Sequence, residues 1–68
     1  MAIKYRELER ILRRLGLSVA RQRGTHQTWV HPDIQEPLTG IVYKEAEVRD
    51  SQWSRVRKWL ARHQLIEE

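Results

Sequence analysis

Hydrophobic residues recur at helical spacing in the first part of the chain. Over residues 4–15 the apolar side chains fall three or four positions apart, and charged side chains fill most of the positions between them. This spacing places the apolar side chains on one face of a helix; they are Tyr5, Leu8, Ile11, Leu12 and Leu15. Gly16 follows as a stop signal, so we predict a helix over residues 4–15.

Three segments rich in strand-forming residues come next. They span residues 17–23, 26–31 and 38–43. Gly24 and Thr25 are expected to form a tight turn between the first two strands. Residues 34–37 are expected to form a longer loop after the second strand, and Gly40 marks a weak point or bulge in the third.

A second helical pattern covers residues 51–64, where Asp50 or Ser51 is expected to cap the first turn. Its apolar stripe consists of Trp53, Val56, Trp59, Leu60 and Ala61. The chain therefore predicts one α+β domain over residues 1–68, in the order α-β-β-β-α. Short turns between consecutive strands predict a three-stranded antiparallel sheet, and two amphipathic helices are expected to pack on one of its faces.

The alternation of side chains along the second strand decides which residues the helices cover. His26 and Thr28 share one face of the strand, whereas Gln27 and Trp29 share the other. The tryptophan is by far the largest apolar group, so its face is expected to be buried. His26 is then exposed on the open face, near the arginines of the preceding strand, Arg21 and Arg23.

The balance of charge is compatible with a polyanionic partner. The 68 residues include 13 basic and 9 acidic side chains, a net charge of +4. Residues 1–31 carry seven basic and two acidic side chains. Nucleic-acid binding and simple solubility both explain such a balance. The absence of cysteine excludes disulfides and cysteine-ligated zinc. The first residues have no signal-peptide pattern and no stretch is long enough to cross a membrane, so we expect a cytoplasmic protein.

The remaining aromatic and histidine residues offer weaker candidates. The tryptophans are expected to pack in the core, and Tyr43 is the better candidate for stacking on a base. His31 is expected to be structural, and His63 to lie near a helix end where a cation suits the dipole. The three histidines lack the spacing of a zinc site and no carboxylates cluster for magnesium, so we expect neither a metal nor another cofactor.

Several local motifs resemble the HicA toxin family. They are Leu15-Gly16-Leu17, Arg21-Gln22-Arg23-Gly24-Thr25-His26, Trp29-Val30-His31-Pro32-Asp33 and the stretch from Glu47-Val48 to Arg55-Val56. In that family a glycine, a small hydroxyl residue and a histidine open the second strand. The resemblance covers nearly the whole chain and implies a fold like that of the double-stranded RNA-binding domain.

The sequence also departs from the family pattern. Where the family usually has a Pro-aromatic-His segment after the third strand, this chain has Val42-Tyr43-Lys44. Ala46 stands where a glycine is expected. The second histidine of the site is therefore absent, and Lys44 is expected to supply positive charge in its place.

The resemblance implies a toxin that cleaves mRNA without the ribosome and without a metal, paired with a HicB-like antitoxin. His26 is then the general acid–base residue, because histidine takes or gives a proton near neutral pH. The residues expected to contact RNA are Arg21, Arg23, Gly24, Thr25 and Lys44. Two alternatives stay open: a non-catalytic module that binds double-stranded RNA, and an inactive family member that acts through protein interaction.

Overall fold

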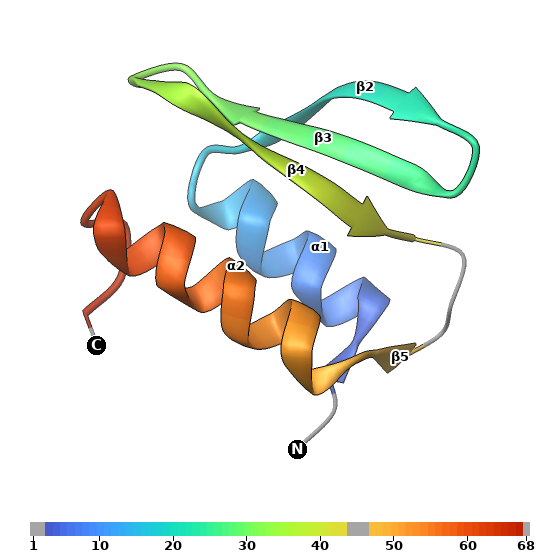
Figure 1. Cartoon of the computed structure of the whole chain (residues 1–68). Coiled ribbons are helices and arrows are strands. Elements are labelled where there is room, and N and C mark those ends of the chain that lie inside the picture. Colours follow the sequence, from blue (N-terminus) through green and yellow to red (C-terminus); the bar gives the residue numbers. More distant parts are fainter. Residues whose placement is uncertain (1–2, 44–46, 68) are drawn as a thin grey trace.

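The computed structural model describes residues 3–43 and 47–67 (Figure 1). The chain forms two helices, a three-stranded antiparallel sheet and a short two-stranded one. The elements in chain order are β1 (Ile3–Lys4), α1 (Tyr5–Arg14), β2 (Ser18–Arg23), β3 (His26–His31), β4 (Ile34–Val42), β5 (Glu47–Val48) and α2 (Asp50–Arg62).

The larger sheet has the strand order β2-β3-β4, and both helices lie on one of its faces (Figure 1). This arrangement confirms the predicted α+β fold and its α-β-β-β-α order. The sequence did not predict the second sheet, in which Ile3 pairs with Val48 and Lys4 with Glu47. Two-residue strands are too short for a period to be read from them. Their pairing joins the start of α1 to the start of α2.

The first helix ends as the sequence predicts, and the second begins differently. Leu17 N donates to Leu12 O at 2.9 Å and Gly16 N to Arg13 O at 3.1 Å, the bond pair of a Schellman stop. Neither Asp50 nor Ser51 is the N-cap of α2: that position is Arg49, whose side chain makes no capping hydrogen bond. Asp50 is already helical because Arg49 leaves β5 in an extended conformation.

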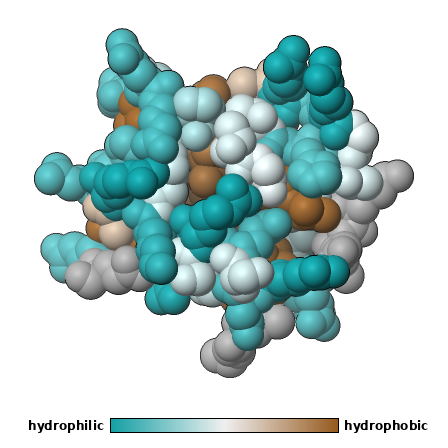
Figure 2. Space-filling view, viewed as in Figure 1, coloured by the Kyte–Doolittle hydropathy of each residue, from teal (hydrophilic) through white to brown (hydrophobic). Residues whose placement is uncertain are grey.

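A single hydrophobic core lies between the sheet and the helices. Leu8 and Leu12 of α1, and Val56, Trp59 and Leu60 of α2, supply its helical side. The sheet contributes Trp29, Leu38 and Ile41, and Leu17 and Val48 complete it. Trp29 is fully buried, as the strand alternation predicts. Trp53 is only partly buried against this core. Space-filling Figure 2 shows hydrophilic side chains over most of one side of the molecule, with smaller apolar areas between them.

The loop predicted over residues 34–37 is wrong, because these residues form the first part of β4. The turn before it is therefore short, and His31 pairs with Ile34. Pro37 is tolerated because β4 is an edge strand and its register shifts between the Trp29 and His31 pairs. A proline in such a stretch breaks no regular ladder bond. The bulge predicted at Gly40 is confirmed: the register shifts there and Gly40 has φ +74°.

Candidate nucleic-acid interface around His26

The β2–β3 hairpin brings the predicted arginines to the histidine. Arg23 pairs with His26 and Arg21 with Thr28 in the antiparallel register. Opposed residues of such a pair project from the same face of the sheet. The helices lie on the other face (Figure 1), so all four side chains lie on the open face. The hairpin therefore places two guanidinium groups and one imidazole on a single uncovered surface.

A β-bulge in β2 places Arg21 and Arg23 on the open face of the sheet. Val19 pairs with the buried Trp29, and strict alternation from Val19 would put Arg21 and Arg23 on the covered face. The register shifts between Val19 and Arg21, so Ala20 is the extra residue. One inserted residue exchanges the two faces for everything beyond it. The bulge thus turns Arg21 and Arg23 toward His26, and Gln22 toward the core.

The His26 side chain is exposed and has a neighbour that orients it. Thr25 Oγ1 lies 3.3 Å from His26 Nδ1. Which of the two atoms donates depends on the tautomer. Within residues 3–43 and 47–67, His26 Nε2 has no hydrogen-bond partner. Through its contact with Nδ1, Thr25 restrains the orientation of the imidazole ring.

The turn that carries Thr25 is tight. Gly24 has φ +60°, and Tyr43 N donates to Thr25 O at 3.1 Å, which ties the turn to the residue after β4. A two-residue hairpin turn with glycine at its first position requires a positive φ there. The positive φ of the turn is therefore sufficient to explain why a glycine stands at position 24.

Behind His26, a buried amide holds the covered side of the hairpin together. Gln27 is 6% exposed, and its Oε1 accepts hydrogen bonds from Tyr5 OH at 2.6 Å and Trp29 Nε1 at 3.2 Å. Its Nε2 donates to Gln22 Oε1 at 3.3 Å, and Gln22 Nε2 donates to Tyr43 OH at 2.7 Å. This network fixes the strand residue next to His26 to both α1 and β2.

The surroundings of Tyr5 shift the pKa of its phenol. Burial raises the pKa of the Tyr5 phenol above its usual value of 10.0, and the carboxylate of Glu9 raises it further. The hydrogen bond to Gln27 acts in the opposite direction. Tyr5 is therefore held as a neutral donor to Gln27.

Other candidate residues lie away from the open face. Tyr43 belongs to the Gln22 network on the covered side, so it is not beside His26 as a stacking partner. His31 Nδ1 accepts a bond from Asp33 N at 3.1 Å, in keeping with a structural role. Lys44, predicted to contact RNA, lies outside the described residues.

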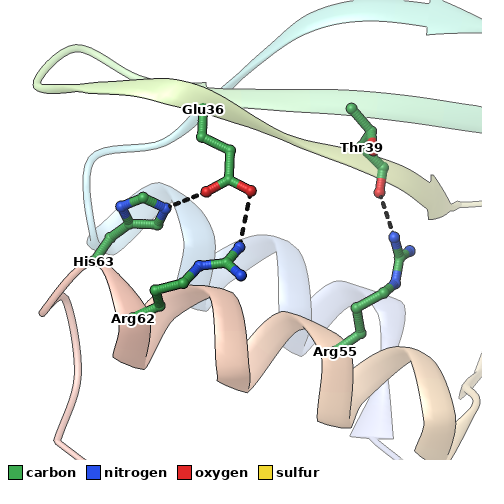
Figure 3. A network of polar contacts seen from close by, with 5 residues as sticks. All are labelled: Glu36, Thr39, Arg55, Arg62 and His63. Atoms are coloured by element: carbon green, nitrogen blue, oxygen red, sulfur yellow. Dashed lines mark hydrogen bonds and ion pairs between the residues drawn. The ribbon is translucent and has the colours of Figure 1, made fainter.

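A second polar cluster was not predicted from the sequence. Glu36 of β4 lies 2.8 Å from Arg62 Nη2 and 2.7 Å from His63 Nε2 at the end of α2 (Figure 3). Nearby, Arg55 donates to Thr39 O at 2.9 Å and Gly40 O at 3.0 Å. These contacts join the edge strand to α2. Because the sequence predicts a loop over residues 34–37, it provides no strand register from which the partners of Glu36 follow.

Neither a metal cluster nor a membrane helix is present in the described part of the chain. No group of three or more histidine or acidic side chains within residues 3–43 and 47–67 is placed to hold a metal ion. In the same residues, no helix has the length and apolar character needed to cross a bilayer.

The fold and this surface define a small basic α+β domain, with an exposed histidine and two arginines on the uncovered face of its sheet. Residues 5–49 match the family described as HicA toxin of bacterial toxin-antitoxin, and the chain belongs to that family. The matched stretch contains the whole hairpin and His26. The family membership identifies this protein as a toxin of a toxin–antitoxin system. Neither a curated protein nor a solved structure gives a significant match.

Proposed function

We propose that this toxin is an endoribonuclease that cleaves mRNA without the ribosome and without a metal, with His26 as its general acid–base residue. The observation that carries the proposal is the pairing of an exposed imidazole with Arg23 on the open face. Membership of a toxin family and the net charge of +4 add support. We place the activity in the cytoplasm, where mRNA is found.

The chemistry needs little from the protein because RNA carries its own nucleophile. The 2′-hydroxyl attacks the adjacent phosphorus while His26 Nε2 accepts its proton. A new P–O2′ bond forms and the P–O5′ bond breaks, which leaves a 2′,3′-cyclic phosphate. The protonated imidazole then returns its proton to the departing 5′-oxygen. Such proton transfer contributes roughly a hundred- to ten-thousand-fold to a rate.

Arg21 and Arg23 bind and neutralise the phosphate in this proposal. A guanidinium group presents a planar fork of donors that matches phosphate oxygens. Fixed positive charge aimed at the five-coordinate phosphate lowers the barrier further. Thr25 orients the imidazole through Nδ1, and Lys44 adds charge as the sequence predicts. Thr25 and Gly24 also bring the backbone of the turn close to the RNA.

The proposed partner is a HicB-like antitoxin that covers the His26 face. A protein bound there keeps RNA away from Arg21, Arg23 and His26 at once. An acidic surface on the partner fits the two guanidinium groups. Binding of the antitoxin and of RNA should therefore be mutually exclusive.

The test is RNA cleavage in EDTA by the native protein, His26→Ala and a matched control, His63→Ala. We expect the native protein and His63→Ala to cleave, and His26→Ala to lose at least a hundredfold in rate. His63 is a suitable control because it contacts Glu36, away from the open face. Tight RNA binding without cleavage would instead support a double-stranded RNA-binding module. Negligible binding would leave protein interaction as the function. Cleavage by His26→Ala at the native rate removes the mechanism.

A further inference from the structure

A groove of about 540 Å³ lies between the end of β4, the short strand β5 and the start of α2. Its described lining includes Thr25, Val42, Val48, Gln52 and Arg55. The volume falls within the range of sites that hold small ligands. None of the steps proposed for His26 uses this groove.

The groove adjoins the histidine through a shared residue. Thr25 lines the groove and its hydroxyl lies 3.3 Å from His26 Nδ1. Val42, also in the lining, is the β4 partner of His26. An RNA strand with one phosphate at His26 therefore has this groove within reach of the next nucleotide.

One polar side chain in the groove is fixed with its donors unused. Gln52 Oε1 accepts a hydrogen bond from Val42 N at 3.3 Å. Because the amide oxygen is committed to the backbone, the amide orientation is set. Its Nε2 has no partner among the described residues, and Gln52 lines the groove. Such an amide is suited to recognise the edge of a nucleobase by hydrogen bonding.

Arg55 also lines the groove, and hydrogen bonds hold its guanidinium group in place. Arg55 is bonded through both terminal nitrogens to Thr39 O and Gly40 O, and Figure 3 shows the side chain reaching from α2 to β4. Two bonds to neighbouring carbonyls restrain the plane of the group. RNA bases that are unstacked from their neighbours pack on planar arginine groups as they do on aromatic rings.

The lining offers apolar surface as well as charge. Val42 and Val48 give the groove apolar walls that suit a base, and its charged side chains include Glu47, Arg49 and Arg55. The guanidinium of Arg55 is already occupied by carbonyl oxygens. Phosphate has better partners in Arg21 and Arg23 on the open face.

We propose that this groove binds the nucleobase of the RNA nucleotide next to the scissile phosphate, with Gln52 reading its edge and Arg55 packing on its plane. The inference rests on the proposed nuclease function and adds a determinant of sequence preference. It requires single-stranded RNA, because a paired base does not present its edge to the groove.

The decisive variant is Gln52→Glu. A carboxylate keeps the acceptor for Val42 N but replaces the amide donors with acceptors. The matched control is Gln64→Glu, which adds the same charge beyond the far end of α2. Both proteins are compared with the native toxin on single-stranded RNAs that vary one nucleotide at a time, in EDTA. We expect Gln52→Glu to change the preference among nucleotides about tenfold or more, and Gln64→Glu to retain the native preference.

A binding measurement separates this inference from the nuclease proposal. His26→Ala is titrated with each of the four ribonucleoside monophosphates, and backbone amide shifts are followed by NMR. We expect shifts at Val42, Val48 and Gln52, weakened by Arg55→Lys and retained in Arg62→Lys. Thermal unfolding of each variant controls for loss of structure.

The outcomes are distinct. Cleavage with an unchanged preference in folded Gln52→Glu overturns the groove and leaves the nuclease intact. A native protein that does not cleave overturns the nuclease, and the NMR titration then decides the groove on its own. The absence of shifts around the groove with all four nucleotides overturns the inference.

Discussion

Arg23 lies directly opposite His26 on the open face of the sheet, because the two form the last pair of the β2–β3 hairpin before its turn. Opposed residues in an antiparallel pair have Cβ atoms about 5 Å apart. Two long side chains that start so close can reach one phosphate without a change in the backbone. The proposed site therefore depends on the hairpin register more than on any loop.

The open-face arginines should govern how RNA binding responds to salt. We expect Arg21→Ala and Arg23→Ala each to weaken binding by a similar factor on RNAs of different sequence. Each change should lower the slope of log K against log salt by about one, the effect of losing one phosphate contact. The measurement is a fluorescence anisotropy titration in the His26→Ala background at several salt concentrations.

Arg10→Ala is the matched control for this prediction. Arg10 is an exposed arginine of α1, on the opposite side of the sheet from His26. It should leave the slope close to that of the parent. A slope that falls equally for all three variants would show that net charge, and not the open face, binds RNA.

Much of the fold follows from the sequence because the relevant signals are local. The helical stripe containing Leu8 and Leu12 predicts the buried face of α1, and Gly16 predicts its end. Alternation along β3 predicts that Trp29 is covered and His26 exposed, and both are observed. In each case the signal is a period or a stop residue that acts within a few positions.

The rest depends on pairing between distant residues. Nothing in residues 18–23 marks Ala20 as the extra residue, because the bulge exists only relative to β3. The period of two along a strand predicts one shared face for Arg21 and Arg23, yet the bulge determines which face that is. Gln27 could be placed on the covered side, but its acceptor role depends on Tyr5 and Trp29, which the fold brings to it.

The two positive-φ glycines of the sheet should differ in their response to alanine. A Cβ on Gly24 meets nothing within 4 Å, so Gly24→Ala adds only backbone strain at φ +60°, about 1 kcal/mol. A Cβ on Gly40 lies 3.2 Å from Arg55 Nη2, in addition to φ +74°. Gly40→Ala should therefore cost about 2–3 kcal/mol, because Arg55 must also move. Urea unfolding measures both values.

A double-mutant cycle identifies the cause of that difference. If displacement of Arg55 contributes to the cost, Gly40→Ala with Arg55→Ala is less destabilised than the sum of the two single changes. Gly24→Ala combined with Arg55→Ala serves as the comparison and should be additive. Equal costs for the two glycine variants would contradict the role assigned to Arg55.

The buried amide of Gln27 should be important for stability. Gln27→Leu leaves Tyr5 OH and Trp29 Nε1 without their acceptor, and unpaired buried donors cost about 1–3 kcal/mol each. We expect a total loss of about 2–4 kcal/mol in urea unfolding, with Gln35→Leu at an exposed position as control. Adding Tyr5→Phe to Gln27→Leu should recover part of the loss, because one orphaned donor is removed. No recovery would show that the cost comes from shape and not from hydrogen bonding.

The Tyr5 phenol should make the protein less stable in alkali. Burial raises the pKa of Tyr5 above 10.0 in the folded state, so the native protein holds this proton more tightly than the unfolded chain does. The protonated phenol therefore contributes its full share to the free energy of unfolding below about pH 10. This contribution is lost as the pH rises through the folded-state pKa.

The titration of Tyr5 can be followed separately. The sequence has two tyrosines, so in Tyr43→Phe the tyrosinate absorbance reports Tyr5 alone. We expect a midpoint above pH 10 in the folded protein and close to 10 in urea. Urea unfolding of Tyr43→Phe between pH 9 and 11, compared with Tyr5→Phe/Tyr43→Phe, should show a decline in stability that the double variant largely lacks. Equal midpoints in folded and unfolded protein would show that burial and the carboxylate of Glu9 do not hold the phenol in its neutral form.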